Sequence, residues 1–108
     1  MEQLGIREKN GSNYVLFEIE GNLNSYTMQE FSEKVYTNIK ERIVIVDMER
    51  VTSIDSTGVG LIMAAFNDGE ELSHHFYIMN PASSVRNALD NTGFGSLFHF
   101  IHSVTEID

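Results

Sequence analysis

The sequence contains no cysteine, and only seven of its 108 residues are lysine or arginine. Without cysteine the protein cannot form disulfides, use a thiolate nucleophile or bind zinc through sulfur, and this composition fits a reducing compartment. No apolar run approaches the roughly 18 to 20 residues that a membrane-spanning helix requires. Residues 1–10, MEQLGIREKN, also lack the apolar core of a signal peptide. We therefore expect a cytoplasmic protein with no membrane partner.

Acidic residues outnumber basic residues by 16 to 7, which gives a formal net charge of −9 at pH 7. A surface of this sign repels the phosphate backbone, so binding to nucleic acid is disfavoured. Acidity alone also serves solubility. The apolar content of 42% is ordinary for a globular protein, and this length suits one modest core, so we assign residues 1–108 to a single domain.

Hydrophobic periodicity predicts strands that alternate with helices. Strands are expected at residues 3–9, 14–21, 42–48, 74–79 and 98–103, and helices at residues 25–40, 57–72 and 82–91. The β-branched run at 42–48 is typical of a central strand covered on both faces, and Asn10-Gly11 favours a hairpin between the first two strands. Single strands alternating with helices imply right-handed crossovers. The predicted fold class is α/β, with helices packed on a mixed, mostly parallel sheet of about five strands.

Several residues suit the ends of the predicted helices. Ser25 or Thr27 can cap the first helix, and Glu30 stands where a capping box from Thr27 would need it. Pro81 suits the first turn of the third helix. Ser103 can cap a last helical turn near the end of the chain.

The joint between the third strand and the second helix reads VTSIDSTGVG, residues 51–60. In α/β sheets, function tends to lie where the carboxyl end of a strand meets the next helix. We expect residues 49–54 to carry the chain over the edge of the sheet, with Ile54 anchored in the core. The next three residues are of types that cap helices, because their oxygens accept the unpaired N–H groups of the first turn. These are Asp55, Ser56 and Thr57.

Two glycines fall within the first turn of the same predicted helix. Gly58 and Gly60 each cost roughly 0.5–1 kcal/mol of helix stability relative to alanine. Because glycine leaves the backbone bare, we expect another molecule to approach this turn closely. Ser56 would lie at the positive end of the helix dipole, where an added phosphate is tolerated and its charge is felt by a partner. The residues alone leave a second interpretation open, in which Asp-Ser-Thr is only a helix cap.

Residues 54–60, IDSTGVG, resemble the signature of STAS domains, in particular that of the bacterial anti-sigma factor antagonists. Residues 19–24, IEGNLN, resemble the segment before the first helix of that family, and residues 89–94, LDNTGF, resemble the end of its third helix. The order and spacing of the elements agree along most of the chain. The resemblance implies a single STAS-like domain.

The resemblance also implies a partner switch that is controlled by phosphorylation. The phosphoacceptor serine of the family maps onto Ser56. In its unphosphorylated form the protein would bind an anti-sigma factor that is also a serine kinase of the GHKL type, and thereby free the sigma factor. Phosphorylation would release the complex, and a PP2C-type phosphatase would reset it. The protein would be a substrate and a binder, with no catalysis and no cofactor of its own.

We expect the partner to contact the loop and the helical turns around Ser56. One side of the second helix, including Leu61 and Ala65, should pack on the sheet, which leaves Val59, Ile62 or Met63 as candidates for partial exposure. Family members often carry aspartate where this chain has Asn24; asparagine keeps the hydrogen bonding and loses the charge. The expected partner-binding residues are Asn24, Asp55, Ser56, Thr57, Gly58, Val59, Ile62 and Met63.

Other constellations carry little chemistry. His74 and His75 would point to opposite faces of a strand, and His99 and His102 lack a carboxylate pattern, so no metal site is expected. The chain has neither the third glycine of a dinucleotide fingerprint nor a Walker lysine. Two alternatives stay open. One is a STAS module that is never phosphorylated and serves as a scaffold or as an accessory subunit of a transport system. The other is a small enzyme or nucleotide hydrolase, which no motif supports.

Overall fold

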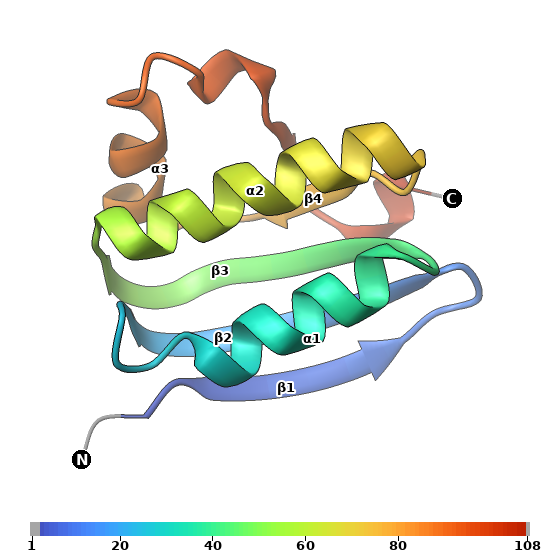
Figure 1. The fold of residues 1–108 in the computed structure, drawn as a ribbon, viewed down its shortest axis with the longest axis horizontal. Helices are drawn as coiled ribbons and strands as arrows, with labels where there is room; N and C mark the ends of the chain where they lie inside the picture. Colours follow the sequence, from blue (N-terminus) through green and yellow to red (C-terminus); the bar gives the residue numbers. More distant parts are fainter. Residues whose placement is uncertain (1–2, 108) are drawn as a thin grey trace.

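Five strands form one sheet, and their order in space follows their order in the chain. The computed structural model describes residues 3–107, with strands β1 (Gly5–Asn10), β2 (Tyr14–Leu23), β3 (Ile43–Ile54), β4 (Phe76–Met79) and β5 (His99–Ile101). β1 pairs antiparallel with β2, and each later strand pairs parallel with the one before it. The predicted mixed, mostly parallel sheet of five strands is confirmed (Figure 1).

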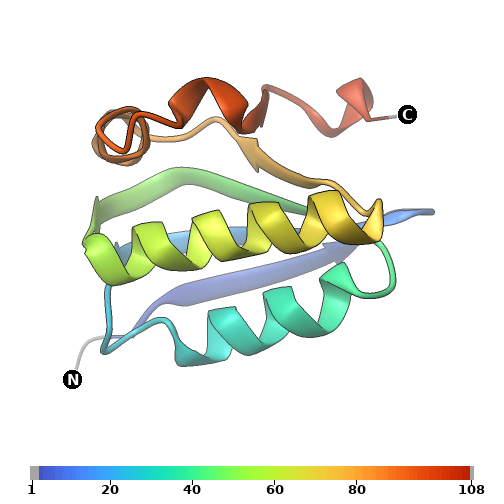
Figure 2. The ribbon, with the colours of Figure 1, turned by 45° about the horizontal axis from the view of Figure 1, so that its top comes forward.

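Three α-helices connect these strands: α1 (Gln29–Ile39), α2 (Ser56–Leu72) and α3 (Ser83–Asp90). Short 3₁₀ turns follow at Gly95–Leu97 and Val104–Glu106. α1 and α2 lie side by side across one face of the sheet (Figure 1, Figure 2), and α3 contacts β3. Within residues 3–107, none of the helices combines the length and the apolar composition that crossing a bilayer demands.

The main core lies between the helices and the sheet. Alternation along each strand turns one set of side chains toward the helices. The buried helical residues are Phe31, Val35, Ile39, Leu61, Ile62, Ala65, Val85 and Leu89. They pack on strand residues such as Phe17, Val46 and Ile78, and the rings of Phe17 and Phe31 meet edge to face with centroids 6.5 Å apart. This packing holds α2 against the sheet.

The other face of the sheet carries a smaller apolar cluster, formed by Leu16, Ile45, Met79 and Ile101. Val104 and Ile107, from the C-terminal 3₁₀ turn and the residue after it, pack against this cluster. Residues 44–46 of β3 are therefore fully buried between two apolar layers, as the continuous β-branched run predicted.

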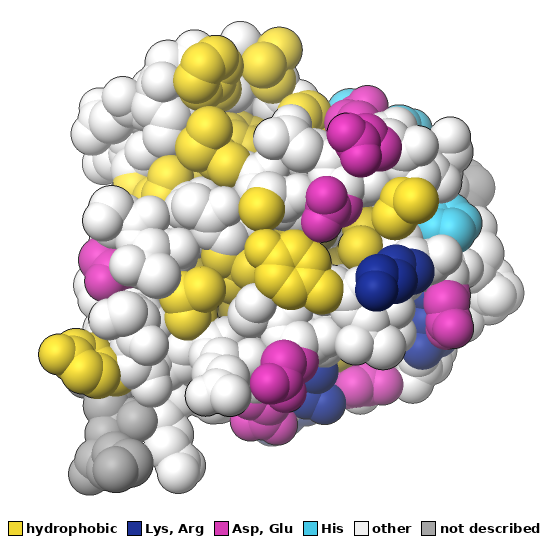
Figure 3. Space-filling model, in the orientation of Figure 1, with side chains coloured by type: hydrophobic (Ala, Val, Ile, Leu, Met, Phe, Trp, Pro, Cys, Tyr) yellow, Lys and Arg dark blue, Asp and Glu magenta, His cyan; other side chains and the backbone are white. Residues whose placement is uncertain are grey.

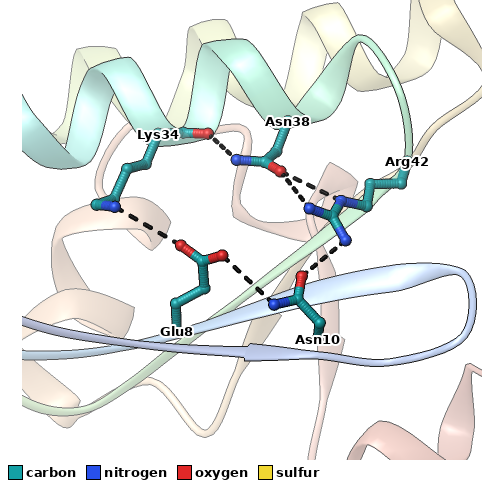
Figure 4. Close-up of polar contacts among 5 residues, drawn as sticks. All are labelled: Glu8, Asn10, Lys34, Asn38 and Arg42. Atoms are coloured by element: carbon teal, nitrogen blue, oxygen red, sulfur yellow. Dashed lines mark hydrogen bonds and ion pairs between the residues drawn. The ribbon is translucent and has the colours of Figure 1, made fainter.

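A polar network ties α1 to the open edge of the sheet (Figure 4). Arg42 donates to Asn10 Oδ1 at 2.7 Å and to Asn38 Oδ1 at 2.9 Å, and Asn38 donates to the carbonyl of Lys34. The Lys34 ammonium lies 3.6 Å from Glu8, whose other oxygen accepts a bond from Asn10. These contacts link the β1–β2 hairpin to the C-terminal half of α1.

The third strand is longer than predicted, and this changes the geometry of the functional joint. β3 runs for 12 residues to Ile54, so residues 49–54 are not a connection over the edge of the sheet. β2 stays paired with them, with Leu23 opposite Ile54, across two irregularities in register. Continued pairing with β2 therefore keeps this charged segment in a strand. Ile54 is half-buried against the core, as expected.

The predicted capping of α1 is wrong. The helix begins at Gln29, later than residue 25, and its N-cap is Met28, which has no side-chain cap bond. The buried hydroxyl of Thr27 instead donates to the carbonyl of Asn22 at 2.7 Å and accepts from the N–H of Asn24. Thr27 is therefore used to shape the loop after β2, and the capping box with Glu30 does not form.

Two other predicted ends have different outcomes. Pro81 precedes Ala82, the N-cap of α3, so it lies outside the first turn of that helix. Ser103 does cap the last 3₁₀ turn, and Glu106 closes the capping box by accepting from the N–H groups of His102 and Ser103.

β4 and β5 are shorter than predicted. His74 lies outside β4 because its N–H donates to the carbonyl of Gly69 at the end of α2.

Candidate functional site

The carboxyl ends of β2 and β3 lie next to each other at one end of the sheet. Leu23 pairs with Ile54 at the end of the two parallel strands, and the N–H of Asp55 donates to the carbonyl of Leu23 at 3.2 Å. Asn24 follows Leu23 directly, so the loop after β2 and the start of α2 are brought side by side. Two segments that lie far apart in the sequence, both expected to bind a partner, therefore share this end of the sheet.

Asp55 provides the cap of α2. Its backbone is extended, and its carboxylate Oδ1 accepts from the N–H of Gly58 at 3.0 Å. Ser56 and Thr57 occupy the first two helical positions, so neither is the N-cap, and both side chains are exposed. The Ser56 hydroxyl stands in solvent at the positive end of the helix dipole. No acidic residue lies in the first turn, although the Asp55 carboxylate is adjacent.

The two glycines of the turn have different roles. Gly58 is buried, and a Cβ atom there would lie 2.8 Å from Ile54 Cγ1 and 2.9 Å from the carbonyl oxygen of Leu23. Glycine at position 58 lets the helix pack closely on the ends of β2 and β3, so the expected approach of a partner to bare backbone is wrong at this position. Gly60 is exposed, and a Cβ atom there would meet nothing within 4 Å. Only Gly60 of this pair is open to another molecule.

The apolar residues of α2 separate into a buried side and a flank. Leu61 and Ala65 are buried against the sheet, as expected. Ile62 is fully buried, so its expected place on the partner surface is wrong; helical spacing turns it toward the core together with Leu61. Val59 and Met63 lie one turn apart on the same flank and are half-buried. They keep some apolar surface close to Ser56.

A shallow apolar groove continues along α2 beyond this flank. Met63, Phe66 and Asn67 line one wall, and Phe94, Leu97 and Phe98 line the other. Phe94 and Leu97 are 49% and 56% exposed, which is unusual for large apolar side chains. Figure 3 shows hydrophobic side chains gathered over this part of the molecule. Sequence reasoning missed the groove, although apolar residues in the turn-rich segment GFGSLF were a signal for it.

The loop after β2 is held by its own hydrogen bonds. The side-chain oxygen of Asn24 accepts from the N–H of Tyr26 at 2.9 Å, which is a local turn that aspartate also forms. Asparagine therefore keeps the hydrogen bonding of the loop without the charge, as expected. Tyr26 is 90% exposed, so this loop presents an aromatic side chain to solvent.

A second cluster lies at the opposite end of α2, where no functional residue was predicted. Glu70, His75 and His99 come from α2, from the segment before β4 and from β5, and their ligand atoms lie within 4.8 Å of one another. Hydrogen bonds to His99 first, and then to His75, lower the pKa of Glu70 below its usual value. From the sequence, only histidines close to one another in the chain were considered as possible metal ligands. Folding of the sheet brings together residues that are far apart in the chain, and these were not considered.

Comparison with known proteins identifies the family. The STAS domain family matches residues 6–107. The chain belongs to the STAS domain family. An anti-sigma-B factor antagonist of Staphylococcus aureus is 28% identical over 93 residues, covering 83% of this chain and 84% of the relative.

Solved structures show the same fold. The anti-sigma factor antagonist SpoIIAA in its unphosphorylated form superposes with a TM-score of 0.78 at 22% identity, covering 96% of this chain and 94% of that one. The phosphorylated form of the Bacillus cell fate determinant SpoIIAA gives a TM-score of 0.76 at 21% identity, covering 96% and 97%. At sequence identities of 22% and 21%, these two superpositions show that the fold is shared.

Proposed function

We propose that this STAS domain is an anti-sigma factor antagonist whose binding is switched by phosphorylation of Ser56. The observation that carries the proposal is the exposed Ser56 hydroxyl in the first turn of α2, next to a cap that Asp55 already provides. The curated relatives that are named anti-sigma-B factor antagonists support the class of function. SpoIIAA, solved in both an unphosphorylated and a phosphorylated form, supports the idea that this fold tolerates the modification.

The proposed binding surface begins at Ser56 and extends along α2. Thr57 and Gly60 offer exposed polar and bare backbone surface, and Val59 and Met63 offer an apolar flank. The groove lined by Met63, Phe94 and Leu97 continues this flank, and exposed apolar surface beside polar residues is typical of reversible interfaces. Asn24 and Asp55 border the surface on the side of the β2 loop.

Phosphorylation would act on the complex through charge. A phosphate adds about 1.5–2 negative charges at neutral pH, and the turn tolerates it because of the helix dipole. An acidic group of the partner about 4 Å away would be repelled by about 4 kcal/mol per charge at an effective dielectric constant of roughly 20. Since about 1.4 kcal/mol is a tenfold change in affinity, such repulsion would release the complex.

The partners that follow from this proposal are an anti-sigma factor that is a GHKL-type serine kinase, and a PP2C-type phosphatase that restores the free hydroxyl. The domain itself is the substrate and the binding module, and performs no catalysis. The second candidate is a STAS module that binds without being phosphorylated, as a scaffold or as an accessory subunit of a transport system.

Incubation with the cognate kinase and ATP tests the proposal. We expect intact mass spectrometry to show one added phosphate on the wild-type chain and none on Ser56→Ala, with Thr57→Ala modified like the wild type. A stable complex with the kinase in which Ser56 stays unmodified would favour the scaffold instead. Phosphate on Thr57 alone would contradict the assignment of Ser56.

A further inference from the structure

We propose that Glu70, His75 and His99 form a binding site for a divalent transition-metal ion, with zinc as the best match. The three side chains approach from α2, from the segment before β4 and from β5. Glu70 Oε1 lies 3.1 Å from His75 Nδ1 and 2.6 Å from His99 Nε2, and every pair among the three ligand atoms is within 4.8 Å.

The separations of the ligand atoms are close to those of a metal centre. With zinc–nitrogen and zinc–oxygen bonds of about 2.0–2.1 Å in tetrahedral geometry, neighbouring ligand atoms lie about 3.3 Å apart. The two oxygen–nitrogen distances, 3.1 Å and 2.6 Å, are slightly shorter than that spacing. Two imidazole nitrogens and one carboxylate oxygen suit zinc and its transition-metal neighbours, whereas calcium and magnesium prefer oxygen ligands alone.

Neighbouring rings hold the two imidazoles in this arrangement. The His99 ring packs against Phe66 and Tyr77, each with centroids 5.5 Å away, and against His75 at 5.1 Å. The His75 ring meets Tyr77 edge to face at 6.2 Å. Restricted rotation of the ligands reduces the entropy that binding must overcome. The two imidazoles are therefore positioned by contacts with Phe66 and Tyr77 that do not depend on their hydrogen bonds to Glu70.

The cluster is open to an incoming ion and carries suitable charge. The side chains of Glu70, His75 and His99 are 39%, 44% and 38% exposed, so an ion can enter and water can complete its coordination. The net charge of −9 also favours cations over anions near the surface.

Metal binding would link the C-terminal end of α2 to β4 and β5. The site lies about 21 Å along α2 from Ser56, at 1.5 Å per residue, so it is separate from the proposed phosphorylation site. Because the three ligands come together only in the folded chain, a bound ion stabilises the fold. The proposal does not depend on the proposed function, and its test uses no kinase.

Calorimetric titration with zinc chloride, and thermal melts with and without zinc, test the site on the full chain without a histidine tag. We expect one ion per chain and a rise in Tm of about 10 °C at a zinc concentration a hundred times Kd. We expect His99→Ala and Glu70→Gln each to weaken binding at least tenfold and to reduce the Tm rise. The matched control, His102→Ala, should bind like the wild type, and magnesium chloride should give no heat.

NMR spectroscopy of the wild-type imidazoles covers the case in which a variant fails to fold. We expect zinc to shift or broaden the signals of His75 and His99 and to leave those of His102 unchanged. No zinc-dependent heat, unchanged affinity in His99→Ala, or equal responses from all four histidines would each overturn the proposal.

Discussion

The carboxylate of Asp55 accepts a hydrogen bond from the backbone N–H of Gly58 at 3.0 Å, and this bond makes Asp55 the cap of α2. Since the cap is provided one residue earlier, the hydroxyl of Ser56 is not needed for it. Ser56 is therefore an exposed residue of the IDSTGVG segment whose side chain the helix cap does not require. The proposed switch rests on these separate roles: Asp55 caps the helix, and the Ser56 hydroxyl stays available for modification.

Removing the cap should destabilise the fold without changing its architecture. We expect Asp55→Ala to lower the free energy of unfolding by about 1 kcal/mol, because the Gly58 N–H loses its acceptor. Asp55→Asn, which keeps a side-chain oxygen, should lie within a few tenths of a kcal/mol of the wild type. Urea denaturation followed by circular dichroism measures both values. Equal stability of Asp55→Ala and the wild type would show that the cap is not important.

The two glycines of the first turn should respond in opposite directions to the same substitution. Gly58→Ala should lower the free energy of unfolding by about 1–3 kcal/mol, because its Cβ would lie 2.8 Å from Ile54 and 2.9 Å from the carbonyl of Leu23. Gly60→Ala should raise it by about 0.5–1 kcal/mol, since its Cβ meets open space and alanine favours the helix. Urea denaturation followed by circular dichroism measures the free energy of unfolding of both variants. A stabilising Gly58→Ala would contradict the close packing.

The apolar groove should contribute to partner binding and little to stability. We expect Leu97→Ser to weaken binding of the anti-sigma factor about tenfold or more, because Leu97 is 56% exposed and lines the groove. Leu72→Ser is the matched control. Leu72 is similarly exposed, at 46%, but it is the last residue of α2 and does not line the groove. Surface plasmon resonance compares the two variants after their melting temperatures are shown to agree. Equal losses in both would exclude a specific role for the groove.

The C-terminal capping box should depend on pH. Backbone hydrogen bonds from His102 and then Ser103 hold the pKa of Glu106 below its usual value of 4.5. A depressed pKa in the folded state means that the carboxylate stabilises the turn above pH 4.5, and that this contribution is lost as the pH falls through the lower folded pKa. NMR titration of the amide signals of His102 and Ser103 should show a midpoint below 4.5, which Glu106→Gln abolishes. A midpoint at or above 4.5 would contradict the hydrogen bonds.

The order of elements and the sheet were predictable because they depend on local patterns. Apolar periodicity marked α1 and α2, and the run at 42–48 marked the centre of β3. The far half of β3 was not predictable, because Glu49 and Arg50 interrupt the apolar pattern and only pairing with β2 keeps this segment in a strand. Thr27 looked like a cap, but its hydroxyl bonds back to Asn22 at the end of β2 and to Asn24 in the following loop, an alternative local pairing that residue type alone does not distinguish from a cap.

The site was predictable in part, because some of its features also depend on local sequence patterns. The types of Asp55 and Ser56 indicated a helix end, and the structure places them there. Whether Ile62 faces the core or a partner depends on the rotation of α2 on the sheet, which its sequence leaves open because apolar residues surround it. The cluster of Glu70 and His99 joins residues 29 positions apart, so no local pattern indicates it.

The affinity of the anti-sigma factor for charge-altered variants tests the central claim most directly. Calorimetry should compare the wild type with Ser56→Ala, Ser56→Asp and Thr57→Asp, once thermal melts show that all four fold alike. We predict that Ser56→Ala binds like the wild type, that Ser56→Asp binds at least a hundredfold more weakly, and that Thr57→Asp loses less than Ser56→Asp. Binding of Ser56→Asp at wild-type affinity, or a Ser56→Asp chain that does not fold, would contradict the account of Ser56 as an exposed switch at the start of α2.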